Sequence, residues 1–136
     1  MRWIFRLLGV LFIVALVVVG VEQYAAESGE VVVLTTNDAE GTPMETRLWV
    51  VDLDGSQYLR SGSDGSGWYQ RLAADPQVEV VRNGTGAVYT AVPDASKTQT
   101  VNRLMAEKYG WADSYIGTLF PRDNAIAIRL EPIDVE

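Results

Sequence analysis

The strongest constraint on the fold is an apolar stretch near the start of the chain. Leu7 to Val21 contains no charged and no polar side chain. Counted from Trp3, this stretch extends to nineteen residues with one charge, Arg6. As an α-helix these residues would span roughly 28 Å, close to the ~30 Å hydrocarbon thickness of a bilayer. The sequence therefore predicts that residues 1–24 form one membrane-spanning anchor.

A cleaved signal peptide is the alternative interpretation of the same residues. The basic start, the apolar stretch and the pair Ala25-Ala26 agree with it. However, Glu22 and Gln23 lie three residues before these alanines, which is not the small-residue pattern of a cleavage site. We therefore expect an uncleaved anchor, followed by a short polar linker at residues 25–30.

The distribution of charge predicts how the anchor is oriented. Arg2, Arg6 and the amino terminus precede the helix, whereas Glu22, Glu27 and Glu30 follow it. The positive-inside rule then places the N-terminus in the cytoplasm. The domain would lie outside the cytoplasm, which in a bacterial cell is the periplasm.

Composition excludes several classes of protein. The chain has 136 residues and a net charge of −7, and an acidic domain repels the phosphates of nucleic acid, so no nucleic-acid partner is expected. Cysteine and histidine are both absent from the sequence, which excludes disulfides, thiolate or histidine metal sites and Ser-His-Asp triads. We predict no metal site and no catalytic side chain, so any redox chemistry would depend on a bound cofactor.

The rest of the chain, residues 31–136, forms one domain with a strand-rich pattern. Asp54-Gly55 and Asn83-Gly84 each lie between two β-branched or apolar runs and predict tight hairpins, so the sheet should be mostly antiparallel. The six predicted strands are residues 31–36, 44–52, 57–60, 78–82, 87–92 and 124–131.

Two helices are predicted alongside these strands. Residues 68–74 have apolar side chains at helical spacing, and a longer helix begins near Ser96 and ends at Gly110. Residues 111–121 are predicted to be an aromatic-rich connection. The expected fold is mainly β within the α+β class: a small six-stranded antiparallel split β-barrel with one or two packed helices, preceded by one transmembrane helix.

The stretch from Trp49 to Val80 is where the sequence points to chemistry. A strand leads into the glycine- and serine-rich loop Ser61 to Gly67, and the loop leads into the helix at residues 68–74. Backbone N–H groups of such a loop and the partial positive charge of a helix N-terminus can hold a phosphate.

Several segments resemble one known family. Leu34-Thr-Thr36, followed by a turn with Gly41 and Pro43, is similar to its first hairpin. The run from Gly62 to Val80 is similar to its loop, its W-Y-x-x-L helix and its N-P-x-V-x-V strand, and Tyr109-Gly110 also fits. This family is the split-barrel flavin-binding superfamily, which includes pyridoxamine 5′-phosphate oxidase and the deazaflavin-dependent nitroreductases.

The resemblance implies a cofactor, FMN or a deazaflavin, in a groove between the barrel and the helices, usually at a homodimer interface. Basic and hydroxyl side chains would hold its phosphates, and aromatic side chains would lie near its ring. By position, the phosphate candidates are Arg47, Arg60, Ser61, Ser63 and Arg71, and the ring candidates are Trp68 and Tyr69.

The sequence leaves two functions open for an anchored chain, and a third, a soluble secreted binding domain, if residues 1–24 are cleaved as a signal peptide. The first is a membrane-anchored oxidoreductase that uses this cofactor. The second is a non-catalytic accessory or assembly subunit of a larger bacterial membrane complex, with no cofactor. Residues 37–40 favour the second function, because this turn is acidic where the family often has a basic residue, and it would repel a phosphate. The arginines could equally form ion pairs, and Trp68 and Tyr69 could equally pack in the core.

Overall fold

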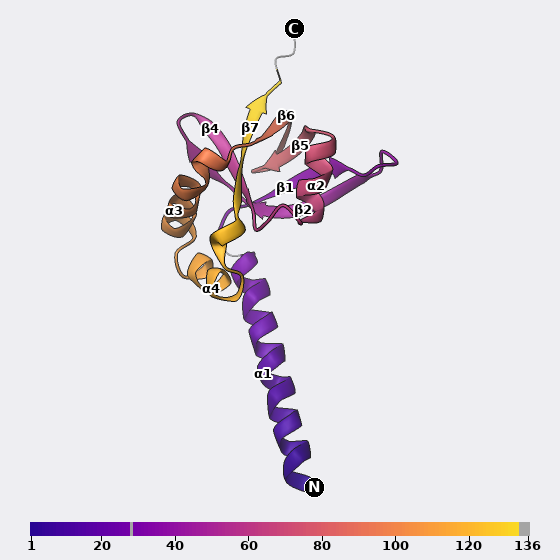
Figure 1. The fold of residues 1–136 in the computed structure, drawn as a ribbon, viewed down its shortest axis with the longest axis vertical. Coiled ribbons are helices and arrows are strands. Elements are labelled where there is room, and N and C mark those ends of the chain that lie inside the picture. The colour runs from indigo at the N-terminus through magenta and orange to yellow at the C-terminus, as the bar shows by residue number, and fades with distance from the viewer. Residues whose placement is uncertain (28, 134–136) are drawn as a thin grey trace.

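A computed structural model describes residues 1–27 and 29–133 of the chain (Figure 1). The α-helices of these residues are α1 (Arg2–Ala26), α2 (Gly67–Ala74), α3 (Thr98–Tyr109) and α4 (Trp111–Leu119). The strands are β1 (Val31–Asn37), β2 (Pro43–Trp49), β3 (Val51–Leu53), β4 (Ser56–Ser61), β5 (Gln77–Arg82), β6 (Thr85–Pro93) and β7 (Ile126–Pro132). Two short 3₁₀ turns, Ala95–Lys97 and Arg122–Asn124, precede α3 and β7.

The described strands form one antiparallel sheet that curls into a half-barrel. Its order is β2-β1-β5-β6-β7-β4-β3. The strands at its two ends, β2 and β3, are separated in the chain only by Val50. The sheet must therefore curl until its ends meet. The prediction of one strand over residues 44–52 is wrong at Val50, and residues 1–27 and 29–133 contain seven strands instead of the predicted six.

The strand breaks at Val50 because the last turn of α3 bonds to its backbone. The Val50 N–H donates to the Tyr109 hydroxyl at 3.0 Å, and the Val50 carbonyl accepts from Lys108 Nζ at 2.8 Å. The Tyr109 hydroxyl in turn lies 2.6 Å from the carbonyl oxygen of Glu30. Buried backbone groups need partners, so these bonds replace the sheet bonds that Val50 lacks.

Both predicted hairpins are confirmed. Asp54 and Gly55 have φ values of 52° and 79°, and Asn83 and Gly84 have φ values of 52° and 77°. Positive φ at both central residues is the condition for a type I′ turn, and Asn, Asp and Gly adopt it most easily.

Side chains pack on both faces of the sheet. The inner cluster fills the half-barrel and includes Leu34, Leu59 and Ile128, and α2 adds Trp68 and Leu72 to it. The outer cluster packs α3 against the sheet through Val101, Met105 and Tyr109, together with Val51, Tyr58 and Ala127. The two predicted helices are thus confirmed, and Gly110 ends α3 as expected.

The predicted connection over residues 111–121 is wrong, because Trp111–Leu119 forms the helix α4. Aromatic residues, glycine and threonine give this segment a modest helix propensity. Tertiary contacts compensate: Asp113 is buried in an ion pair with Arg60, and the Tyr115 hydroxyl donates to the Val18 carbonyl of α1 at 3.0 Å.

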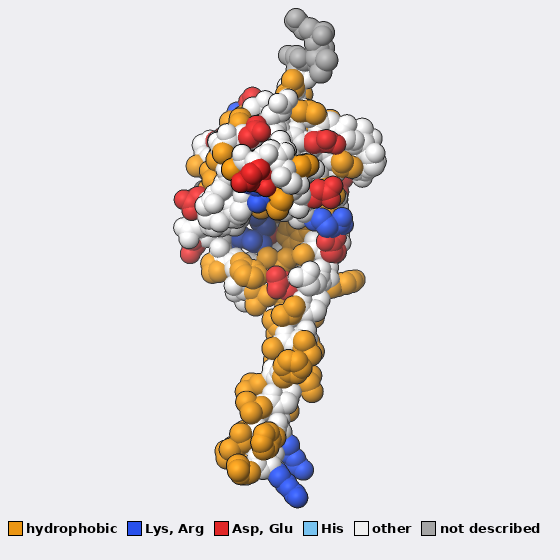
Figure 2. Space-filling view, turned by 90° about the vertical axis from the view of Figure 1, so that its right-hand side faces the viewer, with side chains coloured by type: hydrophobic (Ala, Val, Ile, Leu, Met, Phe, Trp, Pro, Cys, Tyr) orange, Lys and Arg blue, Asp and Glu red, His pale blue; other side chains and the backbone are white. Residues whose placement is uncertain are grey.

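The first helix, α1, extends away from the domain (Figure 1). By length and composition it could cross a membrane, and its most apolar part is not buried by the rest of the structure. Figure 2 shows hydrophobic side chains along the helix and basic side chains at its free end. Only its last turns contact the domain, mainly at α4.

An ion network ties the start of β1 to the rest of the sheet. The Glu30 carboxylate lies 2.8 Å from Arg82 and 2.6 Å from Lys108, and Arg82 also pairs with Asp52 at 2.8 Å. Hydrogen bonds from Arg82 and then Lys108 lower the pKa of the Glu30 carboxyl from 4.5 to about 2.

We expect Tyr109→Phe to lower the free energy of unfolding by about 1–3 kcal/mol, because it leaves the buried Val50 N–H without a partner. Chemical denaturation of the full-length protein in detergent would measure this. Tyr89→Phe is the matched control, since its half-buried hydroxyl only accepts from Gln57 Nε2. Equal effects of the two substitutions would contradict the role assigned to Tyr109.

We also expect a pH dependence that Glu30 controls. Its pKa is lower in the folded protein, so the stability it contributes is complete above pH 4.5 and is lost as the pH falls towards 2. Glu30→Gln should lower the stability at pH 7 by roughly 1–3 kcal/mol and flatten this acid dependence. Denaturation at several pH values would measure both effects, and Glu45→Gln, at an exposed position of β2, should change neither.

Candidate functional site

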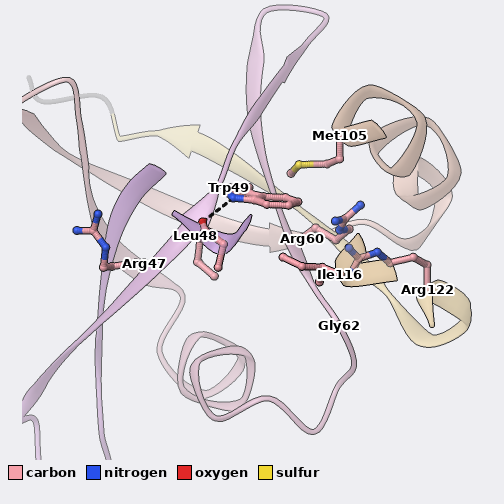
Figure 3. Close-up of a pocket in the computed structure, with 9 residues that line it drawn as sticks. Arg47, Leu48, Trp49, Arg60, Gly62, Met105, Ile116 and Arg122 are labelled. Atoms are coloured by element: carbon pink, nitrogen blue, oxygen red, sulfur yellow. Dashed lines mark hydrogen bonds between the residues drawn. The ribbon is translucent and has the colours of Figure 1, made fainter. Parts of the chain in front are cut away.

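The candidate site is a cavity of about 170 Å³ between the sheet and the helices α3 and α4, which we call the Trp49 cavity (Figure 3). Its wall combines apolar side chains with three arginines, which suits a ligand that has both a planar apolar part and a negative charge. The lining residues are Ala26, Arg47, Leu48, Trp49, Arg60, Gly62, Met105, Ile116 and Arg122.

Trp49 is held rigidly in the wall of this cavity. Its ring stacks on Tyr109, with ring centres 4.2 Å apart and an angle of 6° between the planes. Its indole N–H donates to the carbonyl of Ala26 at 2.8 Å (Figure 3). A flat side chain fixed by two partners is a prepared surface for a planar ligand.

Arg60 and Arg122 lie on the same side of Trp49 (Figure 3) and share one carboxylate. Arg60 Nη2 is 2.7 Å from Asp113 Oδ1, and Arg122 Nη2 is 3.2 Å from the same oxygen. Arg60 Nη1 also donates to Asn102 Oδ1 at 3.2 Å. The Arg60 side chain is only 6% exposed, so this pair is almost removed from water.

Among the described residues, this cluster contains two positive charges, on Arg60 and Arg122, and one negative charge, on Asp113. Asp113 is the only carboxylate there within 4 Å of either guanidinium. Arg122 Nε is buried and has no hydrogen-bond partner among the described residues. Burial, and then the charge of Arg60, lower the pKa of the Arg122 guanidinium from its usual value. An excess positive charge on Arg122, whose side chain is 22% exposed but whose Nε is buried and unpaired, favours an anionic ligand.

Arg47, a predicted phosphate ligand, forms an ion pair with Glu27 in this structure. It lines the rim of the cavity, but its guanidinium points away from the other labelled side chains (Figure 3). It pairs with Glu27 at 2.7 Å and its side chain is 59% exposed. This pair lowers the pKa of the Glu27 carboxyl through a hydrogen bond from Arg47. Arg47 therefore joins β2 to the end of α1.

The predicted serine ligands bond to one another. Ser61 Oγ donates to the Ser63 carbonyl at 2.6 Å and lies 2.8 Å from Ser66 Oγ. Ser63 Oγ accepts from the Gly65 N–H at 3.2 Å. Neither Ser61 nor Ser63 lines the Trp49 cavity.

The remaining predicted residues also lie away from the cavity. Trp68 is buried in the inner core, and Tyr69 packs against it. Arg71 lines a separate and larger groove of about 710 Å³ between α2 and the β1–β2 turn. That groove also contains Asp38 and Asp75, so its acidic side chains outnumber its arginine and it suits an anion poorly. The structure thus brings together only Arg47 and Arg60 of the predicted set.

Three residues of the cavity wall, Trp49, Met105 and Arg122, and the carboxylate partner Asp113 were not predicted as site residues. One sequence signal could have pointed to the arginine cluster. Asp113 is the only charged residue between Trp111 and Pro121, and a single acid in such an apolar segment is usually buried with a basic partner.

The comparison with solved structures gives relatives of the same fold. HutZ, the heme storage protein from Vibrio cholerae, matches with 17% identity and a TM-score of 0.60, over 83% of this chain and 88% of that one. An F420-H2 dependent reductase, FDR-A, matches with 24% identity and a TM-score of 0.56, over 73% and 92%. A putative pyridoxamine 5′-phosphate oxidase from Listeria innocua matches with 14% identity and a TM-score of 0.58, over 84% and 92%.

These likenesses show that the chain shares the fold of these solved structures. Neither the comparison with protein-family models nor the comparison with curated proteins gives a match.

The charge imbalance of the arginine cluster predicts unequal effects on stability for its two arginines. Arg60→Met removes the closest partner of a buried carboxylate and should lower the free energy of unfolding by about 3 kcal/mol or more. Arg122→Met removes the surplus charge and the unpaired donor, and should change it by less than about 1 kcal/mol. Denaturant titration would measure both, and an equal loss in the two variants would show that the cluster holds no surplus charge.

Proposed function

We propose that this chain is a membrane-anchored split-barrel protein that binds FMN or a deazaflavin in the Trp49 cavity and serves as an oxidoreductase. The bound cofactor would supply hydride or electron transfer, and the protein would bind and orient it. Two of the solved structures with this fold support the cofactor class by their descriptions, an F420 reductase and FDR-A.

The observation that carries this proposal is the unpaired Arg122 Nε beside the buried Arg60–Asp113 pair. An anionic group of the cofactor would accept from Arg122 and balance the surplus charge. The ring would lie against the fixed face provided by Trp49, with Met105 and Ile116 as further apolar wall. We do not extend the proposal to haem, because the chain lacks histidine and cysteine, two of the common iron ligands.

The size of the cavity refines this proposal. A volume of about 170 Å³ is below the ~300 Å³ at which pockets for small molecules usually begin. One chain therefore encloses only part of an FMN-sized molecule. We propose that the rest is covered by a second copy of the chain, so that the binding unit is a homodimer.

We further propose that α1 is the membrane anchor. Its length and apolar composition support this, and the basic residues Arg2 and Arg6 at its free end favour a cytoplasmic N-terminus. The domain would then lie in the periplasm of a bacterial cell.

A second function, a non-catalytic accessory subunit of a membrane complex, is favoured by a different observation. The predicted phosphate ligands are engaged within the chain: Arg47 with Glu27, and Arg71 Nε with Thr36 Oγ1 at 2.8 Å. Only the arginine cluster at Arg122 retains an unpaired donor among the buried groups of the described residues. Because Arg47 and Arg71 are paired within the chain, the barrel would stay folded without a cofactor, as an accessory subunit requires.

Cofactor titration distinguishes the two functions. Full-length protein in detergent would be titrated with FMN and, separately, with a deazaflavin, and the fluorescence of each would be followed. Arg122→Met should weaken binding about tenfold or more, because a hydrogen bond to a charged group contributes ~1.5–3 kcal/mol. Arg103→Met, at an exposed position of α3 outside the Trp49 cavity, is the matched control and should bind as the parent does.

The outcomes separate clearly. Binding that depends on Arg122 supports the cofactor proposal. If the cofactor binds and Arg122→Met leaves the affinity unchanged, the cofactor binds at a site other than the Trp49 cavity. If neither cofactor binds, the oxidoreductase proposal fails and the accessory function remains.

A further inference from the structure

The exposed surface of α4 and of Phe120, which follows it, carries no charge and combines apolar side chains with the hydroxyls of Ser114 and Thr118. Trp111 and Phe120 are each 52% exposed, and Leu119 is also exposed. The single charged residue between Trp111 and Pro121 is Asp113, and it is buried against Arg60. A hydroxyl on this surface is also satisfied, since Thr118 Oγ1 donates to the Ser114 carbonyl at 2.9 Å.

This surface lies beside the last turns of α1. The Tyr115 hydroxyl donates to the Val18 carbonyl at 3.0 Å, and the Trp111 ring stacks on Tyr24 with centres 5.9 Å apart. Figure 1 shows α4 next to the point where α1 meets the domain.

The contact at Val18 fixes the depth of α4 relative to the apolar stretch. Val18 lies three residues before Val21, where that stretch ends, which corresponds to about 4.5 Å along a helix. Tyr24 lies a similar distance beyond the end. The helix α4 therefore lies level with the boundary between the apolar part of α1 and the polar linker.

We propose that α4 is embedded in the lipid–water interface of the membrane that α1 crosses, and that it holds the domain against the bilayer. This inference rests on the proposed anchor. Tryptophan and tyrosine favour that interface, and helices of this kind insert an apolar face about 5–10 Å into the headgroup region. The partner is a zwitterionic phospholipid surface, because residues 25–136 carry a net charge of −8 and anionic lipids would repel them.

Spin-label depth measurements test this placement. The chain has no cysteine, so one introduced cysteine carries one label. Three variants of the full-length protein would be labelled separately in phosphatidylcholine nanodiscs: Thr118→Cys on the exposed side of α4, Ala73→Cys on the exposed side of α2, and Val14→Cys in α1. Relative accessibility to oxygen and to a water-soluble nickel complex reports the depth of each label.

We expect the label at residue 14 in the hydrocarbon, the label at residue 118 within about 10 Å of the headgroup boundary, and the label at residue 73 in water. A buried label at residue 14 together with a label at residue 118 as water-exposed as that at residue 73 would overturn the α4 proposal and leave the anchor intact. A water-exposed label at residue 14 would overturn the anchor, and the α4 proposal with it.

Discussion

The hydroxyl of Tyr109 supports the residue that joins the two end strands of the half-barrel. Val50 separates the strands at the two ends of the sheet, and its backbone has its partners in α3 instead of in another strand. The same tyrosine fixes the start of β1 through the Glu30 carbonyl and stacks on Trp49. The curled sheet, the position of α3 and the aromatic wall of the cavity are therefore linked through one side chain.

The elements that the sequence predicts well are those that short-range chemistry decides. Asp54-Gly55 and Asn83-Gly84 require left-handed backbone whatever surrounds them, and Gly110 ends α3 for a local reason. The break at Val50 has no such local signal, because a valine within a β-branched run favours a continuous strand. Its cause is Tyr109, fifty-nine residues further along the chain. Similarly, α4 depends on α1 and on Arg60, and its own sequence does not predict a helix.

The candidate site is less predictable than the fold, because a charged side chain is defined by its partners. Arg47 and Arg60 look alike in the sequence, since each lies on a strand next to apolar residues. The structure pairs Arg47 with an exposed glutamate of α1 and Arg60 with a buried aspartate of α4. The Arg47–Glu27 pair contributes little to stability because water surrounds it. The Arg60–Asp113 pair is almost removed from water, so it places strong charges beside the cavity. Arg122 belongs to the candidate site because it shares Asp113 with Arg60, which the sequence does not reveal.

The two bonds between β2 and the last turn of α1 have a consequence for how the cavity responds to its surroundings. Trp49 bonds to the Ala26 carbonyl and Arg47 to Glu27, so a wall of the cavity is attached to the end of α1. Within a bilayer, the tilt of such a helix depends on the thickness of the hydrocarbon. Under the proposals that α1 is a membrane anchor and that the cavity binds a cofactor, cofactor affinity and helix tilt would be thermodynamically coupled. The occupancy of the cavity would then depend on membrane thickness.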